Sequence, residues 1–468
     1  MNNIPCFDEL INNLNNFFVN NSNFFTLESK IEDLGDNFIK NLYEQLLEYL
    51  DSSFKNSRER KEKYYVKDKI VNRTLITSLG SISINITRYQ NKETHKSYVY
   101  IYDLLALKPY QRLTLYAMYQ IVKKSMELNM AQAGQHSLRN EVISRSTVSK
   151  IIKKLDGRLK ELEKDVKRSV NTIYIEVDEI HANLQNPKKN AKEKSKNSIC
   201  PVVVVHEGHI DPNKKRKQLK NPHYFALPNF RYKDCYELAY DYIKRNYRID
   251  NIKYTFISGD GGNGILDYDT CFGNAIFVAD KFHISKKLLY IFKDKSLVSI
   301  ARSYLNNNKL DMFNKLAELQ YEKYPEQKSK MKKFVKFITK NINHIINQNH
   351  LEYKCCCSME GTISMKYARY ITSSPFAFSE QGLANKLNLL TLKANKHNLT
   401  FEDFLILLYG KDYQKEYIDK VENMMNKKVK VSIKDNPKYK IKTAPIPKLD
   451  TNSGQEFING LIKGYSII

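Results

Sequence analysis

The stretch NTIYIEVDEIHA, residues 171–182, decides the fold class of this chain. Its side chains alternate in character, which is typical of a β-strand whose two faces meet different surroundings. The two faces carry Ile173, Ile175 and Val177 on one side and Tyr174, Glu176 and Asp178 on the other. From this strand onward the pattern of the chain is that of an α/β domain.

Further strands and helices follow in a definite order. The patterns predict strands at 199–208, 223–229, 252–262 and 274–283, a helix at 235–247, and a helix that starts near His283. Three strands, a helix, two strands and then helices are the order of a ribonuclease-H-like fold. In that fold the first and fourth strands are neighbours, so Asp178 and Asp260 are expected side by side despite their distance in sequence.

The chain before this α/β region is predicted to be mainly helical, with one β-hairpin. Residues 1–65 carry an apolar stripe at steps of four: Leu34, Phe38, Leu42, Leu46 and Leu50. The period changes at 73–89, where alternation around Gly80 predicts a hairpin. Helical patterns resume from about residue 110 to residue 128.

The segment ISRSTVSKIIKKL, residues 143–155, predicts a helix capped by Ser144. Its buried face would carry Val148, Ile151, Ile152 and Leu155. The exposed Ser146, Thr147 and Lys150 are short or basic, as a helix in the DNA major groove requires. With the preceding helix and turn, the segment is similar to a helix-turn-helix, and an ordinary amphipathic helix in a bundle is an equal alternative.

The later chain predicts a helical block and a basic tail. Residues 295–352 are rich in Lys and Asn, are helically periodic and show no strand pattern. The predicted parts are an N-terminal helical region (1–65), a hairpin and helix-turn-helix-like region (66–165), an α/β catalytic domain (166–294 and 353–415), a helical insertion (295–352) and a C-terminal tail (416–468).

Composition and charge narrow the class of partner. The chain has 468 residues, with 76 Lys and Arg against 51 Asp and Glu, which gives a formal charge of +25. Such an excess indicates a polyanionic partner, usually nucleic acid, with solubility as the alternative explanation. Four consecutive cations, Lys214, Lys215, Arg216 and Lys217, predict part of a DNA-binding surface, although charge runs are commonly solvated loops.

The sequence also argues against several other classes of protein. Its start lacks the pattern of a secretory signal, and no apolar run approaches the length of a membrane span. Seven cysteines without a CxxC pair argue against a zinc ribbon and a disulfide framework. We therefore expect a cytoplasmic, reduced protein, associated with the bacterial nucleoid if DNA is its partner.

Three acidic residues form the candidate catalytic site. Asp178 lies on the first strand, Asp260 follows the fourth strand, and Glu360 lies near the start of a late helix. Carboxylates gathered in this way suit Mg²⁺, and two such ions about 4 Å apart promote in-line phosphoryl displacement. Solvated strand ends and helix-dipole interactions are the ordinary alternatives, and the glycines around Asp260 also resemble a loose phosphate-binding loop without its Lys.

The choice of Glu360 as third acid rests on its neighbours. Glu352 ends a polar block, where a solvated charge is expected, and Glu380 follows Ser379 at the start of another helix. Ile363 and Tyr367 would continue one helical face with Glu360, which predicts that its side chain points inward.

Several strings of this chain resemble one family of transposases. YIEVDEIHANLQ, VVHEGH, FISGDGGNGI, FVADKFHISKKL and CSMEGTISMKYARYITSSP are similar, in order and spacing, to ISLre-type insertion-sequence transposases of the "ISLre two" group. These are DDE enzymes of bacterial mobile elements, distantly related to Mutator-like transposases. The resemblance covers most of the chain and includes the hairpin that begins at Arg73.

The resemblance implies roles for particular residues. Asp178, Asp260 and Glu360 match the catalytic and metal-binding triad, and Asp280 and His283 match a D-x-x-H signature with a supporting role. Three residues that are usual in the family are replaced here, by Gly264, Thr362 and Met365. The acidic triad remains intact, but these replacements bear on whether this copy of the mobile element is active.

The leading interpretation is therefore a DDE transposase that cleaves and transfers DNA strands with two Mg²⁺ ions, with Mn²⁺ as a substitute. Double-stranded DNA at the element ends and at the target would be its partner, and a homo-oligomer would form the synaptic complex. A ribonuclease-H-like nuclease without strand transfer and a non-catalytic DNA-binding protein are the alternatives.

Overall fold

The computed structural model describes most of the chain between residues 27 and 419. The described residues are 27–155, 166–185, 197–211, 218–229, 231–262, 265–372, 377–396 and 398–419, with the single residues 12, 16, 162, 213 and 422. The chain divides into two units, residues 1–38 with 416–468 and residues 39–415. The second unit holds both sheets and the candidate site. The cations at 214–217 and nearly all of the predicted tail lie outside the described residues.

The predicted hairpin is confirmed and is longer than expected. Strands β1 (Tyr64–Thr77) and β2 (Gly80–Asn91) pair in antiparallel fashion up to Thr77 and Gly80, and the short β3 (Ser97–Tyr98) adds to β2. Gly80 has a φ of 111°, a conformation that favours glycine at the turn. Because β1 begins at Tyr64, the helical region ends slightly before the predicted residue 65.

Helix α2 (Leu27–Asn56) covers an edge of β2 with carboxylates. Three backbone N–H groups of the strand donate to acidic side chains: Ser83 to Glu44 at 2.7 Å, Asn85 to Glu48 at 2.7 Å, and Thr87 to Asp51 at 2.9 Å. The acids are spaced by four and three residues, so they share one face of the helix. This face satisfies strand N–H groups that a neighbouring strand would otherwise take up.

The apolar stripe predicted for this helix is wrong in its middle. Leu42 and Leu46 are exposed, with 48% of Leu46 accessible, whereas Leu47 and Phe54 are buried. The helix turns its carboxylates to the sheet edge, so the buried face is the one that carries Leu47, Asp51 and Phe54 and not the predicted stripe.

The helical region after the hairpin contains three helices in contact. They are α5 (Leu115–Ser125), α6 (Met130–His136) and α7 (Arg145–Lys153). The predicted start of α7 is confirmed, since Ser144 accepts a hydrogen bond from the Thr147 N–H at 3.3 Å. The predicted buried face is confirmed as well. The connection between α6 and α7 is longer than the three or four residues typical of a helix-turn-helix.

Gly134 lets α6 approach the segment before α7. A Cβ atom at this position would lie 2.0 Å from the carbonyl oxygen of Ile143, whose N–H donates to the Gly134 carbonyl at 2.9 Å. A backbone atom cannot move aside as a flexible side chain would.

We expect Gly134→Ala to lower the free energy of unfolding by about 1–3 kcal/mol, the range for overpacking a tight contact. Urea unfolding followed by circular dichroism measures this loss. Gly35→Ala is the matched control, because a Cβ there meets no described atom within 4 Å and helical Gly→Ala is favourable by about 0.5–1 kcal/mol. Equal effects of the two changes would contradict the close packing.

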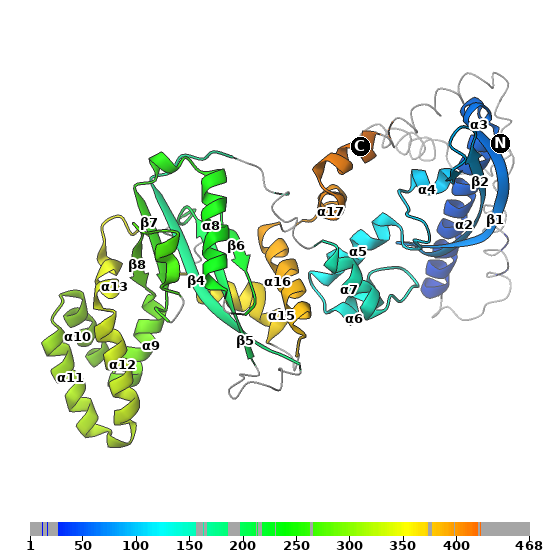
Figure 1. Cartoon of the computed structure of the whole chain (residues 1–468). Helices are drawn as coiled ribbons and strands as arrows, with labels where there is room; N and C mark the ends of the chain where they lie inside the picture. Colours follow the sequence, from blue (N-terminus) through cyan, green and yellow to red (C-terminus); the bar gives the residue numbers. More distant parts are fainter. Residues whose placement is uncertain are drawn as a thin grey trace, which may run out of the picture. The chain divides into compact units, whose positions relative to one another are not determined.

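A five-stranded sheet forms the centre of the α/β domain. Its strands are β4 (Thr172–Asn183), β5 (Asn197–His206), β6 (His223–Ala226), β7 (Tyr254–Gly259) and β8 (Ile276–Ala279), in the order β6-β5-β4-β7-β8 (Figure 1). Strand β5 is antiparallel to both β4 and β6, whereas β7 and β8 run parallel to β4. All five predicted strands are therefore confirmed, and so is the predicted adjacency of the first and fourth.

Helices cover both faces of this sheet. Helix α8 (Tyr232–Asn246) packs on the face that carries Ile173, Ile175 and Val177. The opposite face is covered by α14 (Met359–Ile363), the π-helical turn η7 (Ser364–Ala368), α15 (Arg369–Ile371) and α16 (Glu380–Asn395). The side chains of β4 with even numbers, which include Glu176 and Asp178, lie on this second face.

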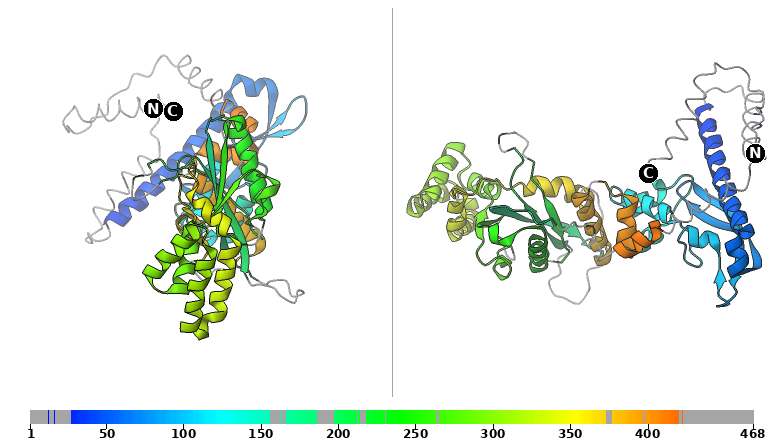
Figure 2. Two further views of the ribbon diagram at one scale, coloured as in Figure 1. Left: turned by 90° about the vertical axis from the view of Figure 1, so that its left-hand side faces the viewer. Right: turned by 90° about the horizontal axis from the view of Figure 1, so that it is seen from above.

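The predicted helical insertion, residues 295–352, shares its core with α9 (Lys281–Phe292), which precedes it. Its helices α10 (Lys295–Asn306), α11 (Leu310–Lys323), α12 (Lys328–Lys340) and α13 (Ile342–Ile346) lie together with α9 (Figure 2). Buried side chains such as Phe292, Phe313 and Ile338 form one cluster between them. The remaining helical elements are α3 (Arg58–Lys63), α4 (Tyr100–Leu104), α17 (Phe401–Tyr409), η3 (Ile249–Asn251), η4 (Asp267–Thr270), η5 (Pro325–Gln327) and η6 (Asn347–Asn349).

Candidate active site

Parallel pairing of β4 and β7 brings the first two acids together. Glu176 pairs with Ser258 in this ladder, so the same register continued by two residues places Asp178 beside Asp260. Glu179, the next residue on β4, accepts a hydrogen bond from the Tyr232 hydroxyl of α8 on the other face. Of the acids in this part of β4, Asp178 is thus the one beside Asp260.

His283 lies among the acidic side chains. Its Nε2 atom is 4.0 Å from Asp178 Oδ2, 4.0 Å from Glu360 Oε2 and 3.7 Å from Asp280 Oδ2. One ligand atom each of Asp178, His283 and Glu360 falls within 4.8 Å of the others, a spacing that could hold a metal ion. Three segments far apart in sequence therefore meet at one point.

Asp280 also begins helix α9. Its Oδ1 atom accepts a hydrogen bond from the Phe282 N–H at 2.9 Å, so Asp280 caps the helix. Its second oxygen, Oδ2, lies 3.7 Å from His283 Nε2, so the residue both starts the helix and faces the imidazole.

The electrostatics of the cluster favour a cation. Burial, helped by the charges of Asp260 and Glu360, raises the pKa of Asp178 to about 6, against the lowering effects of the Glu179 N–H and His283. Burial likewise raises the pKa of Asp280. Carboxyl groups that resist ionisation in this way lack enough positive charge nearby.

Asp260 is held by a tight turn after β7. Its Oδ1 atom accepts a hydrogen bond from the Gly262 N–H at 2.7 Å. Gly261 has a φ of 76°, and a Cβ there would lie 3.3 Å from Asn341 Oδ1. These two glycines thus permit the turn and the close approach of the helical insertion. Their presence is explained by this packing, and a phosphate-binding loop is not needed to explain it.

Glu360 does not point inward as predicted. Its side chain is 58% exposed, although Met359 and Tyr367 are buried. The π-helical turn at Ser364–Ala368 follows Glu360 and breaks the period of 3.6 residues on which the prediction was based. The carboxylate nevertheless reaches His283 from the rim of the cluster.

Two functional candidates escaped the sequence analysis. Lys287 lies on α9, four residues after His283, and burial lowers its pKa while Asp260 opposes that effect. Its Nζ atom lies 4.3 Å from the centre of the Phe337 ring of the insertion. The spacing of Asp280, His283 and Lys287 on one helical face could have indicated it. The other candidate is the buried carboxylate of Glu176.

The predicted DNA-contacting residues of α7 have different surroundings. Ser146 and Lys150 are exposed, whereas the Thr147 hydroxyl lies 2.9 Å from Ser144 Oγ within the cap. Ser146 also lines a cavity of about 760 Å³ with Lys153 of α7 and residues at the start of α16. This cavity places α7 next to the α/β domain.

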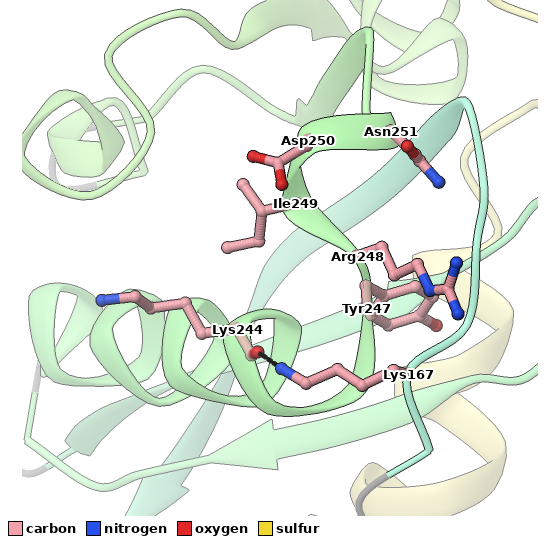
Figure 3. A pocket seen from close by; sticks show the side chains of 7 residues that line it. All are labelled: Lys167, Lys244, Tyr247, Arg248, Ile249, Asp250 and Asn251. Atoms are coloured by element: carbon pink, nitrogen blue, oxygen red, sulfur yellow. Dashed lines mark hydrogen bonds between the residues drawn. The ribbon is translucent and has the colours of Figure 1, made fainter.

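A basic hollow lies at the opposite ends of the parallel strands. It has a volume of about 550 Å³, and Figure 3 shows its cations Lys167, Lys244 and Arg248 around the segment before β7. Lys167 Nζ donates a hydrogen bond to the Lys244 carbonyl. Because this segment precedes β7 and the acids follow it, the hollow is separate from the acidic cluster.

Among the described residues, no helix is long and apolar enough to cross a membrane. Comparison with solved structures finds a likeness to the Drosophila P element transposase strand transfer complex. The two share 12% sequence identity with a TM-score of 0.24, over 63% of this chain and 80% of that chain. A score this low does not define a common fold.

Two proteins of Caldanaerobacter subterraneus subsp. tengcongensis are similar over most of both chains. One is 26% identical over 397 residues, 84% of this chain and 82% of its own length, and its name covers eleven loci. The other is 27% identical over 383 residues, 81% of this chain and 79% of its own length, and its name covers four loci. Both are named UPF0236 proteins. The profile of UPF0236, an uncharacterised protein family, matches residues 18–401, and the chain belongs to this family.

Proposed function

We propose that this chain is a metal-dependent DDE transposase of a bacterial insertion sequence, similar to the ISLre type, with a ribonuclease-H-like catalytic domain. The single observation that carries the proposal is the meeting of Asp178, Asp260, Glu360 and His283 at the point where β7 ends beside the middle of β4. The strand order β6-β5-β4-β7-β8 supports the ribonuclease-H-like fold, as does the antiparallel pairing of β5 with both β4 and β6 beside the parallel strands β7 and β8.

The residues present fit a divalent metal ion. Carboxylate oxygens are the ligands that Mg²⁺ prefers, and imidazole nitrogen suits Mn²⁺ as well. His283 Nε2 is buried and has no hydrogen-bond partner among the described residues, although three carboxylates lie within 4.0 Å. Asp178, Asp260 and Glu360 would hold the ions, with His283 beside them.

The bound ions would lower the barrier to phosphoryl transfer by polarising the phosphate and the attacking oxygen. Asp178 and Asp260 would hold the ions from the rigid sheet, and Glu360 would reach the same ions from α14. Lys287, near Asp260, would balance negative charge that builds up on the phosphate. No covalent protein nucleophile is needed, because water cleaves the element end and the freed 3′-OH attacks the target strand.

The relatives support a mobile element rather than a housekeeping nuclease. One relative's name covers eleven loci of a single genome, which is the result expected from copying of an insertion sequence. The charge of +25 supports double-stranded DNA as the partner, with α7 and the cations at 214–217 as contacts and a homo-oligomer in the synaptic complex.

The test is a cleavage and joining assay with the full chain, Mg²⁺ and DNA from the ends of its own element. We expect a nick that leaves a 3′-OH at the element end, followed by joining to a target plasmid. Asp260→Ala should abolish both steps and leave DNA affinity equal or higher, because it removes a charge that repels phosphate.

Each other outcome selects a different function. Cleavage without joining indicates a nuclease. Specific DNA binding without cleavage, in Mg²⁺ and in Mn²⁺, indicates a DNA-binding protein whose acids are structural.

A further inference from the structure

Glu176 is a buried carboxylate next to the candidate site. It lies on β4 two residues before Asp178, so both side chains project from the same face of the sheet. Only 1% of Glu176 is exposed, and apolar side chains such as Tyr174 and Phe256 surround this part of the face. A buried carboxylate requires compensating hydrogen bonds, and the identity of its partners is informative.

Its main partner is the residue that precedes the helix of Glu360. Glu176 Oε2 accepts hydrogen bonds from the Ser358 backbone N–H at 3.0 Å and from the Ser358 hydroxyl at 2.9 Å. The other oxygen, Oε1, lies 3.3 Å from Nε2 of the buried His206, an approach in ion-pair range without good hydrogen-bond geometry. One carboxylate thus links two strands to the start of α14.

Ser358 occupies the N-cap position of α14 without capping that helix. A serine there normally accepts a hydrogen bond from the second or third N–H of its own helix. No such bond forms at this position of the described chain, and the hydroxyl donates to Glu176 instead. The helix start is therefore fastened to strand β4.

This fastening sets the register between the two candidate metal ligands. Residue 176 binds residue 358, and two residues further along each segment Asp178 and Glu360 meet at His283. Little else restrains Glu360, since its side chain is mostly exposed and a Cβ on Gly361 would meet no described atom within 4 Å. The anchors of this helix start include the Glu176–Ser358 pair and the buried Met359, and Cys357 and Ile363 pack against the same apolar cluster as Met359.

We infer that Glu176 is a positioning residue, which holds Glu360 at metal-binding distance from Asp178 by means of Ser358. The inference rests on the proposed function, because it concerns the metal site of that reaction. Glu176 acts as a hydrogen-bond acceptor and not as a metal ligand. Outer residues that orient metal ligands typically change metal affinity 10- to 100-fold.

The test measures Mn²⁺ binding to the full chain without DNA, by isothermal titration calorimetry. We expect Ser358→Ala to weaken Mn²⁺ binding about tenfold, because it removes one of the two tethering bonds. Glu176→Asp should act in the same direction, because its shorter side chain withdraws from Ser358. DNA affinity measured in Ca²⁺ should stay within about twofold for both, since neither substitution adds or removes a charge and Glu176 is buried.

Two conservative variants separate positioning from charge. Ser358→Thr keeps the hydroxyl and should retain wild-type Mn²⁺ affinity. Glu176→Gln keeps an acceptor oxygen for the two bonds from Ser358 and removes only the charge. We therefore expect Glu176→Gln to stay within about threefold of the wild type.

A matched control accounts for stability. Thr400→Ala removes an ordinary N-cap, that of α17, and should lower stability without changing Mn²⁺ affinity. Wild-type affinity in Ser358→Ala would overturn the inference, as would a loss in Glu176→Gln as large as that in Asp178→Ala. If the wild-type chain binds no Mn²⁺, or if Asp178→Ala binds it equally well, the proposed function itself fails.

Discussion

Glu360→Gln is expected to eliminate Mg²⁺-dependent cleavage, with a loss of at least about 10³-fold. The substitution keeps the size of the side chain and removes the charge that would bind metal. Glu360 Oε2 lies 4.0 Å from His283 Nε2, and its carboxylate raises the pKa of Asp178. Cleavage of the element's own terminal DNA under single-turnover conditions measures the loss.

Glu380→Gln is the matched control for this experiment. Both acids lie in the first turn of a helix that follows a serine, but Glu380 begins α16, where Ser379 caps the helix through the Gly382 N–H at 3.1 Å. Loss of a helix-dipole interaction there affects stability by less than about 1 kcal/mol and leaves cleavage unchanged. A reversed pair of results would place the third acid on α16.

Local patterns in the sequence predicted the strands and the helix starts well. Alternation of side-chain character with a period of two identifies β4, and continuous apolar residues identify β5, because each strand meets its environment residue by residue. The cap at Ser144 depends on atoms within four residues, so it too could be read locally. The adjacency of Asp178 and Asp260 followed from the order of strands alone.

Features that depend on distant partners could not be predicted in this way. The face that α2 turns inward is set by the N–H groups of β2, which require acceptors and not apolar contacts. The direction of Glu360 depends on a π-helical turn that no local pattern indicates. Glu176 appears in the sequence as one of three acids close together, and its contact with Ser358 arises only in the folded sheet.

The second large effect concerns the stability of the metal-free protein. Burial and two neighbouring acids raise the pKa of Asp178 from 3.8 to about 6, and its side chain is only 14% exposed. The folded state therefore binds this proton more tightly than the unfolded state does. Stability from the protonated carboxyl is present below pH 4 and is lost as the pH rises through 6.

We accordingly expect Asp178→Asn to stabilise the metal-free chain at pH 8 by about 2 kcal/mol, most of the difference that such a pKa change implies. The gain should shrink towards zero at pH 4 to 4.5, where the wild-type carboxyl is protonated. Urea unfolding in the presence of a chelator, for both chains across this pH range, measures it. Saturating Mn²⁺ should stabilise the wild type and not the variant, because metal binds only the ionised carboxylate.

Asp294→Asn provides the control with the opposite sign. Asp294 caps α10, and hydrogen bonds from the Leu297 and Ser296 N–H groups lower its pKa. The ionised form of Asp294 therefore contributes stability at a pH above the pKa that the group has in the unfolded chain, and this stability is lost as the pH falls. For this reason Asp294→Asn can only destabilise the chain at pH 8. If Asp178→Asn also destabilises the chain at pH 8 in the presence of a chelator, the ionised Asp178 carboxylate is not destabilised by its burial and by the neighbouring acids. The cluster would then be a satisfied structural network and not a site that a cation completes.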